Sequence, residues 1–224
     1  MQSKQSHNLN LVMIILFYMV LLVVWGIREL WLRSIMSASL GEWSFEVCET
    51  TIKLLVWTLP AAFGVWYYKN DVLLSWREML TAKVKWLKYF LVLLGFIAYN
   101  VIGVFVLNAN FTVSPDFRIS SLVGAVLFVG ITEEAVFRGF FLNALLKKMK
   151  TWYAVLLTAL LFLLIHFPIW IYKGILLSTF LSGGFLLVVV LSIIFSWTFI
   201  KSRNIFVPII LHMSWNLLVI LLFG

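Results

Sequence analysis

Long runs of uncharged apolar residues recur along the whole chain, and they constrain its fold more than any other feature. A helix needs roughly 20 apolar residues to cross the ~30 Å hydrocarbon core of a bilayer. We therefore expect an all-α, polytopic transmembrane helical bundle of about seven spans, with six or eight as alternatives. The predicted spans are 9–27, 51–68, 89–108, 119–146, 151–168, 176–200 and 204–223.

Charged residues are too scarce to cover a water-soluble globule of this size. They make up 12% of the 224 residues, while 63% are hydrophobic, and soluble domains carry about 25% charged residues. A formal net charge of +8 could indicate nucleic-acid binding, but the basic residues lie between apolar runs and not on one face. We expect a single integral membrane domain over 1–224, with the lipid bilayer as its partner and no nucleic acid.

Lysine and arginine are distributed unevenly between the connecting segments, and this bias predicts an orientation. Basic connecting segments stay in the cytoplasm, and most of the basic residues lie on the same side as the N-terminus. We therefore predict a cytoplasmic N-terminus and an external C-terminus. The predicted cytoplasmic set is Lys4, Lys69, Arg77, Lys83, Lys85, Lys88, Lys147, Lys148, Lys150, Lys201 and Arg203, and the external set is Arg28, Arg33, Lys53, Arg118 and Lys173.

The segment 70–88 has apolar residues at steps of three and four with charged residues between them. This spacing is typical of an amphipathic helix that lies on a membrane surface. We predict such a helix on the cytoplasmic leaflet, where it anchors the protein.

Glu133 and Glu134 stand inside an apolar run, whereas the other acidic residues lie in loops or at the edges of runs. An acidic residue near the middle of a spanning helix costs on the order of 3 kcal/mol. Glu134 and Arg138 are spaced i, i+4, so they share a helix face and can neutralise one another. Glu133 points roughly 100° away from Glu134. The simplest interpretation makes Glu134 and Arg138 a structural ion pair and Glu133 the working carboxylate.

Two histidines and an asparagine, His166, His212 and Asn216, also lie inside apolar runs. Glu133 and His166 are each roughly 21–24 Å from the basic turn that joins their helices, so an antiparallel hairpin would bring them level. His212 lies roughly 13 Å and Asn216 roughly 20 Å along the last helix, so Asn216 matches that height better. For all three residues the alternative is hydrogen bonding between helices that serves packing alone.

A carboxylate, two imidazoles and an amide that meet inside a membrane suit hydrolysis. Glu133 could take a proton from water, and His166 and His212 could hold a divalent metal such as zinc or stabilise an oxyanion. Asn216 could donate to an oxyanion, orient His212 or join a metal shell. No Asp lies within a span and the H-E-x-x-H signature is absent, so neither a Ser–His–Asp site nor a soluble metalloprotease is indicated.

Three short motifs in the second half of the chain, over about 119–224, resemble those of a known family. The residues E-E-A-V-F-R at 133–138 resemble its E-E-x-x-x-R motif, F-L-L-I-H at 162–166 its F-x-x-x-H motif, and H-M-S-W-N at 212–216 its H-x-x-x-N motif. They occur in the expected order on successive late spans. The chain is thus similar to the CAAX protease and bacteriocin-processing (CPBP or Abi) intramembrane proteases, and to the Rce1-type prenyl-protein endopeptidases among them.

The resemblance implies an intramembrane endopeptidase with its site in a cavity open to cytoplasm and membrane. Glu133 would activate water with His166 as its partner, and Phe162 would line the cavity. His212 and Asn216 would stabilise the oxyanion or complete a metal site. The substrate would be a peptide or a membrane-tethered protein. The small size is similar to bacterial members, which implies a bacterial cell membrane and a role in bacteriocin maturation or self-immunity.

Two other functions stay open at the level of the sequence. A non-catalytic immunity or receptor-binding membrane protein would use the polar cluster for helix packing or to bind a toxin. A proton-coupled transporter would use the buried Glu and His residues as a relay, although neither an internal repeat nor paired broken helices are visible.

Overall fold

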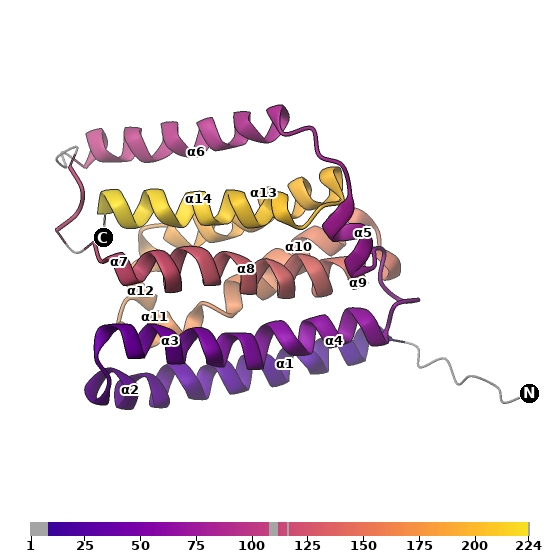
Figure 1. Ribbon diagram of the computed structural model, residues 1–224, viewed down its shortest axis with the longest axis horizontal. Coiled ribbons are helices and arrows are strands. Elements are labelled where there is room, and N and C mark those ends of the chain that lie inside the picture. Colours follow the sequence, from indigo (N-terminus) through magenta and orange to yellow (C-terminus); the bar gives the residue numbers. More distant parts are fainter. Residues whose placement is uncertain (1–8, 108–111, 116, 224) are drawn as a thin grey trace, which may run out of the picture.

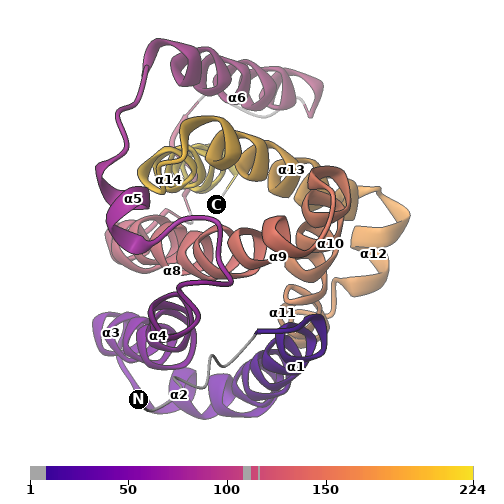
Figure 2. The ribbon, with the colours of Figure 1, turned by 90° about the vertical axis from the view of Figure 1, so that its right-hand side faces the viewer.

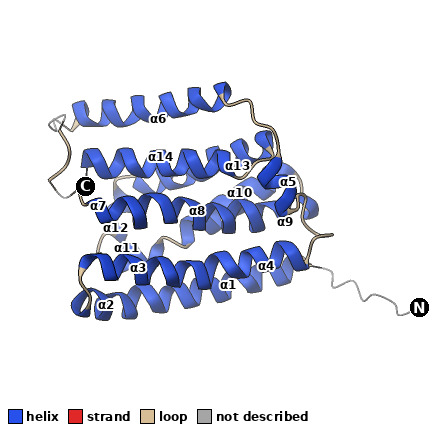
Figure 3. Cartoon of the chain, in the orientation of Figure 1, coloured by secondary structure: helices blue, strands red, loops and turns tan. Residues whose placement is uncertain are grey.

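The protein is a bundle of helices that run side by side, as the computed structural model shows (Figures 1 and 3). The structure describes residues 9–107, 112–115 and 117–223, and these form helices, turns and loops without a strand. The ends of the predicted domain, 1–8 and 224, lie outside the described residues. The all-α prediction is confirmed.

Six helices in the described part of the chain are long and apolar enough to cross a membrane. Three of them are single α-helices: α6 (Leu87–Val106), α13 (Gly184–Ser202) and α14 (Phe206–Phe223). The other three are composite, and η marks their π-helical stretches. They are α1 (Leu11–Ile27), η1 (Arg28–Leu32) and α2 (Arg33–Ser39); α7 (Ile119–Ser121), η3 (Leu122–Phe128), α8 (Val129–Glu134), η4 (Ala135–Leu142) and α9 (Asn143–Lys148); and α10 (Thr151–Leu164) and α11 (Phe167–Tyr172).

A further long helix corresponds to the second predicted span. It consists of α3 (Glu42–Lys53), η2 (Leu54–Thr58) and α4 (Leu59–Tyr67) and lies beside α1 in Figure 1. It is not among the six helices that meet the length and hydropathy of a membrane span. The described residues thus hold six candidate spans, which is one of the alternatives to the predicted seven.

The sixth predicted span, 176–200, begins too early. Gly183 adopts φ 75° and separates α12 (Leu176–Leu181) from α13. Glycine takes this left-handed conformation without the steric cost that a side chain would bring. The sequence is apolar on both sides of this glycine, so hydropathy alone does not reveal that the helix breaks there.

The predicted amphipathic helix over 70–88 is much shorter in the structure. Only α5 (Trp76–Thr81) forms, and Ser75 and Glu78 cap its N-terminus reciprocally. Each side chain binds a backbone N–H that the first turn leaves without a partner. The indole of Trp76 donates to the carbonyl oxygen of Ala62 at 3.1 Å, so α5 is fixed against α4.

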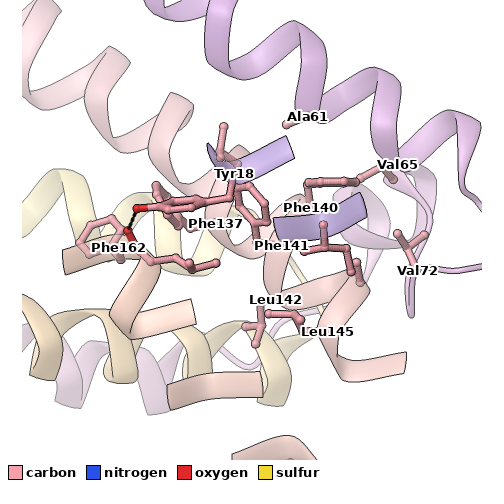
Figure 4. Close-up of a cluster of buried hydrophobic side chains, with 14 of the residues drawn as sticks. Tyr18, Ala61, Val65, Val72, Phe137, Phe140, Phe141, Leu142, Leu145 and Phe162 are labelled. Atoms are coloured by element: carbon pink, nitrogen blue, oxygen red, sulfur yellow. Dashed lines mark hydrogen bonds between the residues drawn. The ribbon is translucent and has the colours of Figure 1, made fainter. Parts of the chain in front are cut away.

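The core is aromatic and surrounds η4. Phe137 and Phe140 are buried, and the rings of Phe137 and Phe162 meet edge to face with their centroids 4.9 Å apart. Figure 4 shows Tyr18 beside them, and its hydroxyl donates to the carbonyl oxygen of Leu161 at 2.7 Å. Figure 2 shows α8 and α9 in the middle of the bundle, between α3 and α4 on one side and α13 and α14 on the other. The segment with the paired glutamates is therefore held at the centre.

Candidate active site

A polar cavity lies between the N-terminal helices and the motif-bearing helices. It encloses about 750 Å³, including its open mouth, and both Glu133 and His166 line it. Its walls come from η1, α3, η3 and the start of α11. The predicted pairing of a carboxylate on the fourth span with an imidazole on the fifth is thus present around one shared space.

His166 lies at the break between α10 and α11, not within a continuous helix. Its Nδ1–H donates to the carbonyl oxygen of Phe162 at 2.7 Å. Because that acceptor is a carbonyl, the hydrogen must reside on Nδ1, and Nε2 of the neutral ring carries the free lone pair. Pro168 follows at the start of α11, where a helix does not need its N–H.

His212 on α14 connects the two glutamates of α8. Its Nδ1 is 2.7 Å from Oε1 of Glu134, and its Nε2 is 3.9 Å from Oε2 of Glu133. The imidazole is buried and stacks on the ring of Phe195, with centroids 4.9 Å apart and 17° between the planes. The ring orientation is therefore fixed by one hydrogen bond and one stacking contact.

The Glu134–Arg138 pair forms in the structure and extends to a third helix. Arg138 donates from Nη1 to Oε1 of Glu134 at 2.9 Å, and both side chains are fully buried. Its Nη2 donates to the carbonyl oxygen and to the hydroxyl of Ser192 on α13, at 2.9 and 2.7 Å. The guanidinium lies between the rings of Phe162 and Phe195.

Sequence reasoning missed Ser192, and it missed the second role of Glu134 as a partner of His212. A serine inside an apolar helix is common and says nothing by itself about its partner. Ser192 and Ser196 do share a helix face at i, i+4, and both are buried. That spacing was the one local signal of a polar contact on α13.

Asn216 is placed differently from the height estimate. Its amide donates to the carbonyl oxygen of Ala125 on η3 at 2.9 Å, and His212, one turn earlier, is the residue level with the glutamates. The expectation that Asn216 matches Glu133 better was wrong. The eight residues of η4 follow Glu133 as a π-helix, which puts more residues into each turn than an α-helix. Glu133 is therefore nearer to the following turn than an α-helical rise gives.

Phe162 lies behind the two histidines instead of on the cavity wall described above. Its ring centroid is 4.9 Å from that of His166 and 6.1 Å from that of His212. Its backbone carbonyl holds His166 and its ring covers the guanidinium of Arg138. In this position it fixes polar groups more than it shapes the cavity.

The donor set does not fit a metal site with three protein ligands. Among the residues that the structure describes, no three His, Cys, Asp or Glu side chains gather closely enough to hold a metal ion. His166 and His212, the two candidate ligands, each use Nδ1 for another partner, which leaves Nε2 as the ring nitrogen that a metal could take, and catalytic zinc sites generally have three protein ligands.

Comparison with known proteins agrees with the motifs. Residues 115–218 match the family described as Rce1-like, type II CAAX prenyl endopeptidase Rce1-like. No curated protein and no solved structure gave a match. The matched range contains all three motifs. The helices before residue 115 are not part of the match. The six apolar helices and this match support an integral membrane protein. Residues 115–218 are thus similar to the Rce1-like family of type II CAAX prenyl endopeptidases.

Proposed function

We propose that the protein is an intramembrane endopeptidase in which Glu133 activates water for attack on a peptide bond. The family supports proteolysis of a protein or peptide substrate in a membrane setting. The observation that carries the finer proposal is that Glu133 and His166 line one polar cavity, while Nε2 of His212 lies 3.9 Å from Oε2 of Glu133. Burial of such polar and charged groups inside apolar helices costs free energy. A reaction site would explain why they are buried there.

Glu133 is assigned the role of general base and later of general acid. Its carboxylate takes a proton from a water molecule in the cavity, and the oxygen of that water attacks the substrate carbonyl carbon. The same proton then passes to the leaving amine as the C–N bond breaks. The free Nε2 lone pair of His166 accepts a hydrogen bond from the same water and orients it toward the carbonyl.

His212 is assigned to the oxyanion that forms on the substrate carbonyl oxygen. Glu134 holds its Nδ1, so Nε2 faces the side where Glu133 lies. In the protonated ring, Nε2–H donates to the developing negative charge. Asn216, through its hydrogen bond to Ala125, holds the η3 backbone that forms part of the cavity wall.

The variant Glu133→Gln tests this proposal. It preserves the shape of the side chain but removes the base, so cleavage should fall by about 10²–10⁴-fold. The assay is mass-spectrometric detection of products from a farnesylated CAAX peptide, with purified protein in liposomes. Glu78→Gln, on the exposed face of α5, is the matched control and should cleave normally. Unchanged turnover by a folded Glu133→Gln protein would overturn the proposal.

The same variant separates a proteolytic role in bacteriocin maturation or self-immunity from a non-catalytic immunity or receptor-binding role. If protection from a peptide toxin depends on proteolysis, bacteria that express Glu133→Gln lose protection together with cleavage. A protein that protects by binding alone would still protect cells that carry this variant.

A further inference from the structure

A second hollow lies on the other side of α8 from the polar cavity, between α4, α5, α8 and α14, and we call it the apolar groove. It encloses about 1060 Å³, including its open mouth, and presents no polar atom to its interior. Ile131 and Ala135 line it, whereas Val129 and Glu133 line the polar cavity. Residues two apart point roughly 200° apart around a helix. The apolar groove is therefore separate from the proposed reaction site.

Lipid surrounds the apolar groove, because α8 and α14 belong to two of the six helices that can cross a membrane. Leu80, Phe206 and Ile210 line the groove and remain 44–46% exposed, so the protein itself leaves them uncovered. An acyl chain fits such a surface. Lipid tails are as apolar as the groove, however, so a chain gains little from its apolar character alone when it enters. A preference for one lipid must come from the polar end of the groove.

The polar end of the groove is a rim formed by α5 and by the turn between α13 and α14. The side-chain amide of Asn204 donates to the carbonyl oxygen of Ala82 at 2.8 Å, and the backbone N–H of Ile205 donates to that of Met79 at 3.0 Å. Trp76 of α5 lines the groove and is held on α4 by its indole hydrogen bond. Hydrogen bonds among three segments distant in sequence thus fix this rim.

Positive charge predominates on the rim. Arg77 lies within α5 and Arg203 follows α13, and both are exposed. Lys83, just after α5, is exposed as well. Glu78 is the acidic residue of α5, and it is close enough to Arg203 to be attracted by it. Three cations and one carboxylate give these four residues a net charge of +2.

A basic rim beside an apolar groove matches a phospholipid in both of its parts. Basic sites next to membrane helices bind the headgroups of anionic lipids. A guanidinium can also donate two parallel hydrogen bonds to the oxygens of one phosphate. An anionic headgroup is favoured over a zwitterionic one, because the rim repels the cationic part of the latter.

We infer that the apolar groove binds an anionic phospholipid of the bilayer, with an acyl chain between α4, α8 and α14 and the headgroup at Arg77 and Arg203. This site does not depend on the proposed peptidase function. The chain packs against Met213, which lines the groove and whose Cγ would lie 2.5 Å from a Cβ on Gly130. The bound lipid therefore supports the contact between α8 and α14.

Native mass spectrometry of the full chain measures which lipid stays bound. The protein in detergent micelles receives equal amounts of dioleoyl-phosphatidylglycerol, which is anionic, and dioleoyl-phosphatidylcholine, which is zwitterionic. The anionic lipid should be retained about tenfold more often, because the rim cations attract its headgroup, and it should raise the melting temperature. Dihexanoyl-phosphatidylglycerol has the same headgroup on short chains and should not displace it.

Variants of the rim then connect the preference to its cations. Arg77→Gln together with Arg203→Gln should abolish the preference for phosphatidylglycerol. Lys147→Gln together with Lys150→Gln is the matched control, since it removes the same charge from the end of α9 and the turn after it, at the same end of the bundle. This control should keep the preference.

A variant of the groove tests the position of the chain. Ala62→Phe fills part of the groove and should reduce retention of phosphatidylglycerol, and Ala98→Phe, on an exposed face of α6, is its control. Thermal unfolding without added lipid verifies that each variant is folded. If Ala62→Phe does not fold, the arginine variants and the short-chain lipid still decide the result.

Equal retention of the two lipids by the wild-type protein would overturn the inference. A preference that survives the loss of both arginines, retention that a folded Ala62→Phe protein keeps, or displacement by the short-chain lipid would also overturn it. Displacement of phosphatidylglycerol by a farnesylated peptide would assign the groove to a substrate chain and would likewise contradict a phospholipid site.

Discussion

At the scale of single residues, one carboxylate oxygen serves two neighbours. Oε1 of Glu134 accepts from Nη1 of Arg138 at 2.9 Å and lies 2.7 Å from Nδ1 of His212. Arg138 is in turn held by Ser192. The orientation of His212 therefore depends on a buried chain of contacts that ends on a different helix. Such chains are sensitive to substitution of any member, because a buried charge that loses its partner is strongly destabilising.

Ser192→Ala should disturb this chain without removing a charge. Arg138 keeps the carbonyl of residue 192 but loses a charge-assisted hydrogen bond of about 1.5–3 kcal/mol. We expect a lower melting temperature and a several-fold lower kcat with an unchanged KM, since His212 is positioned less well. Ser214→Ala, on a partly exposed face of α14, should change neither kcat nor KM. A lower melting temperature with wild-type kcat would limit Ser192 to a structural role.

At the scale of elements, the site depends on a close crossing between α8 and α14. A Cβ on Gly130 would lie 2.5 Å from Cγ of Met213 and 3.4 Å from its backbone nitrogen. The missing side chain lets α14 approach α8, and His212 lies directly before Met213. Small residues allow membrane helices to pack this closely. The glycine thus contributes to the site without touching substrate.

Gly130→Val should separate α8 from α14 and lengthen the contacts of His212. Overpacking of this kind costs about 1–3 kcal/mol, and we expect cleavage to fall while the helix content measured by circular dichroism stays constant. Gly95→Val on α6 is the control, because nothing lies within 4 Å of a Cβ at that position. Equal activity of the two variants would show that the crossing does not position the site.

At the scale of the whole molecule, the charged cavity and the excess of basic residues lie at opposite ends of the bundle. Figure 1 places α2, α11 and the start of α3 at one end, and α5, α9 and the end of α4 at the other. If the basic end faces the cytoplasm, the cavity opens on the external side. The family resemblance implies a cytoplasmic opening, so the two expectations exclude one another.

Single-cysteine labelling distinguishes these orientations. Cys48→Ala removes the one cysteine of the chain. Gly41→Cys then marks the exposed turn at the cavity end, and Lys69→Cys marks the exposed turn at the basic end. A membrane-impermeant maleimide should label Gly41→Cys in intact bacterial cells and Lys69→Cys only after permeabilisation. The reverse pattern would place the cavity mouth in the cytoplasm and contradict the predicted orientation.

The sequence by itself determined the membrane class, most of the helices and the placement of Glu134 and Arg138 on one helix face. These depend on hydropathy and on contacts one turn apart, which are local properties of the chain. It did not determine the break at Gly183 or the short length of α5, because turn and cap chemistry ended these helices within apolar sequence.

Only the tertiary structure decided which polar groups meet. The π-helical turns after Glu133 and the close packing at Gly130 set the level of His212, and Ser192 acquires its partner Arg138 from a helix distant in sequence. Hydropathy specifies that a helix is buried in lipid but not how far it slides or rotates against its neighbours. A shift of a few ångströms, invisible in the sequence, decides whether a carboxylate and an imidazole meet.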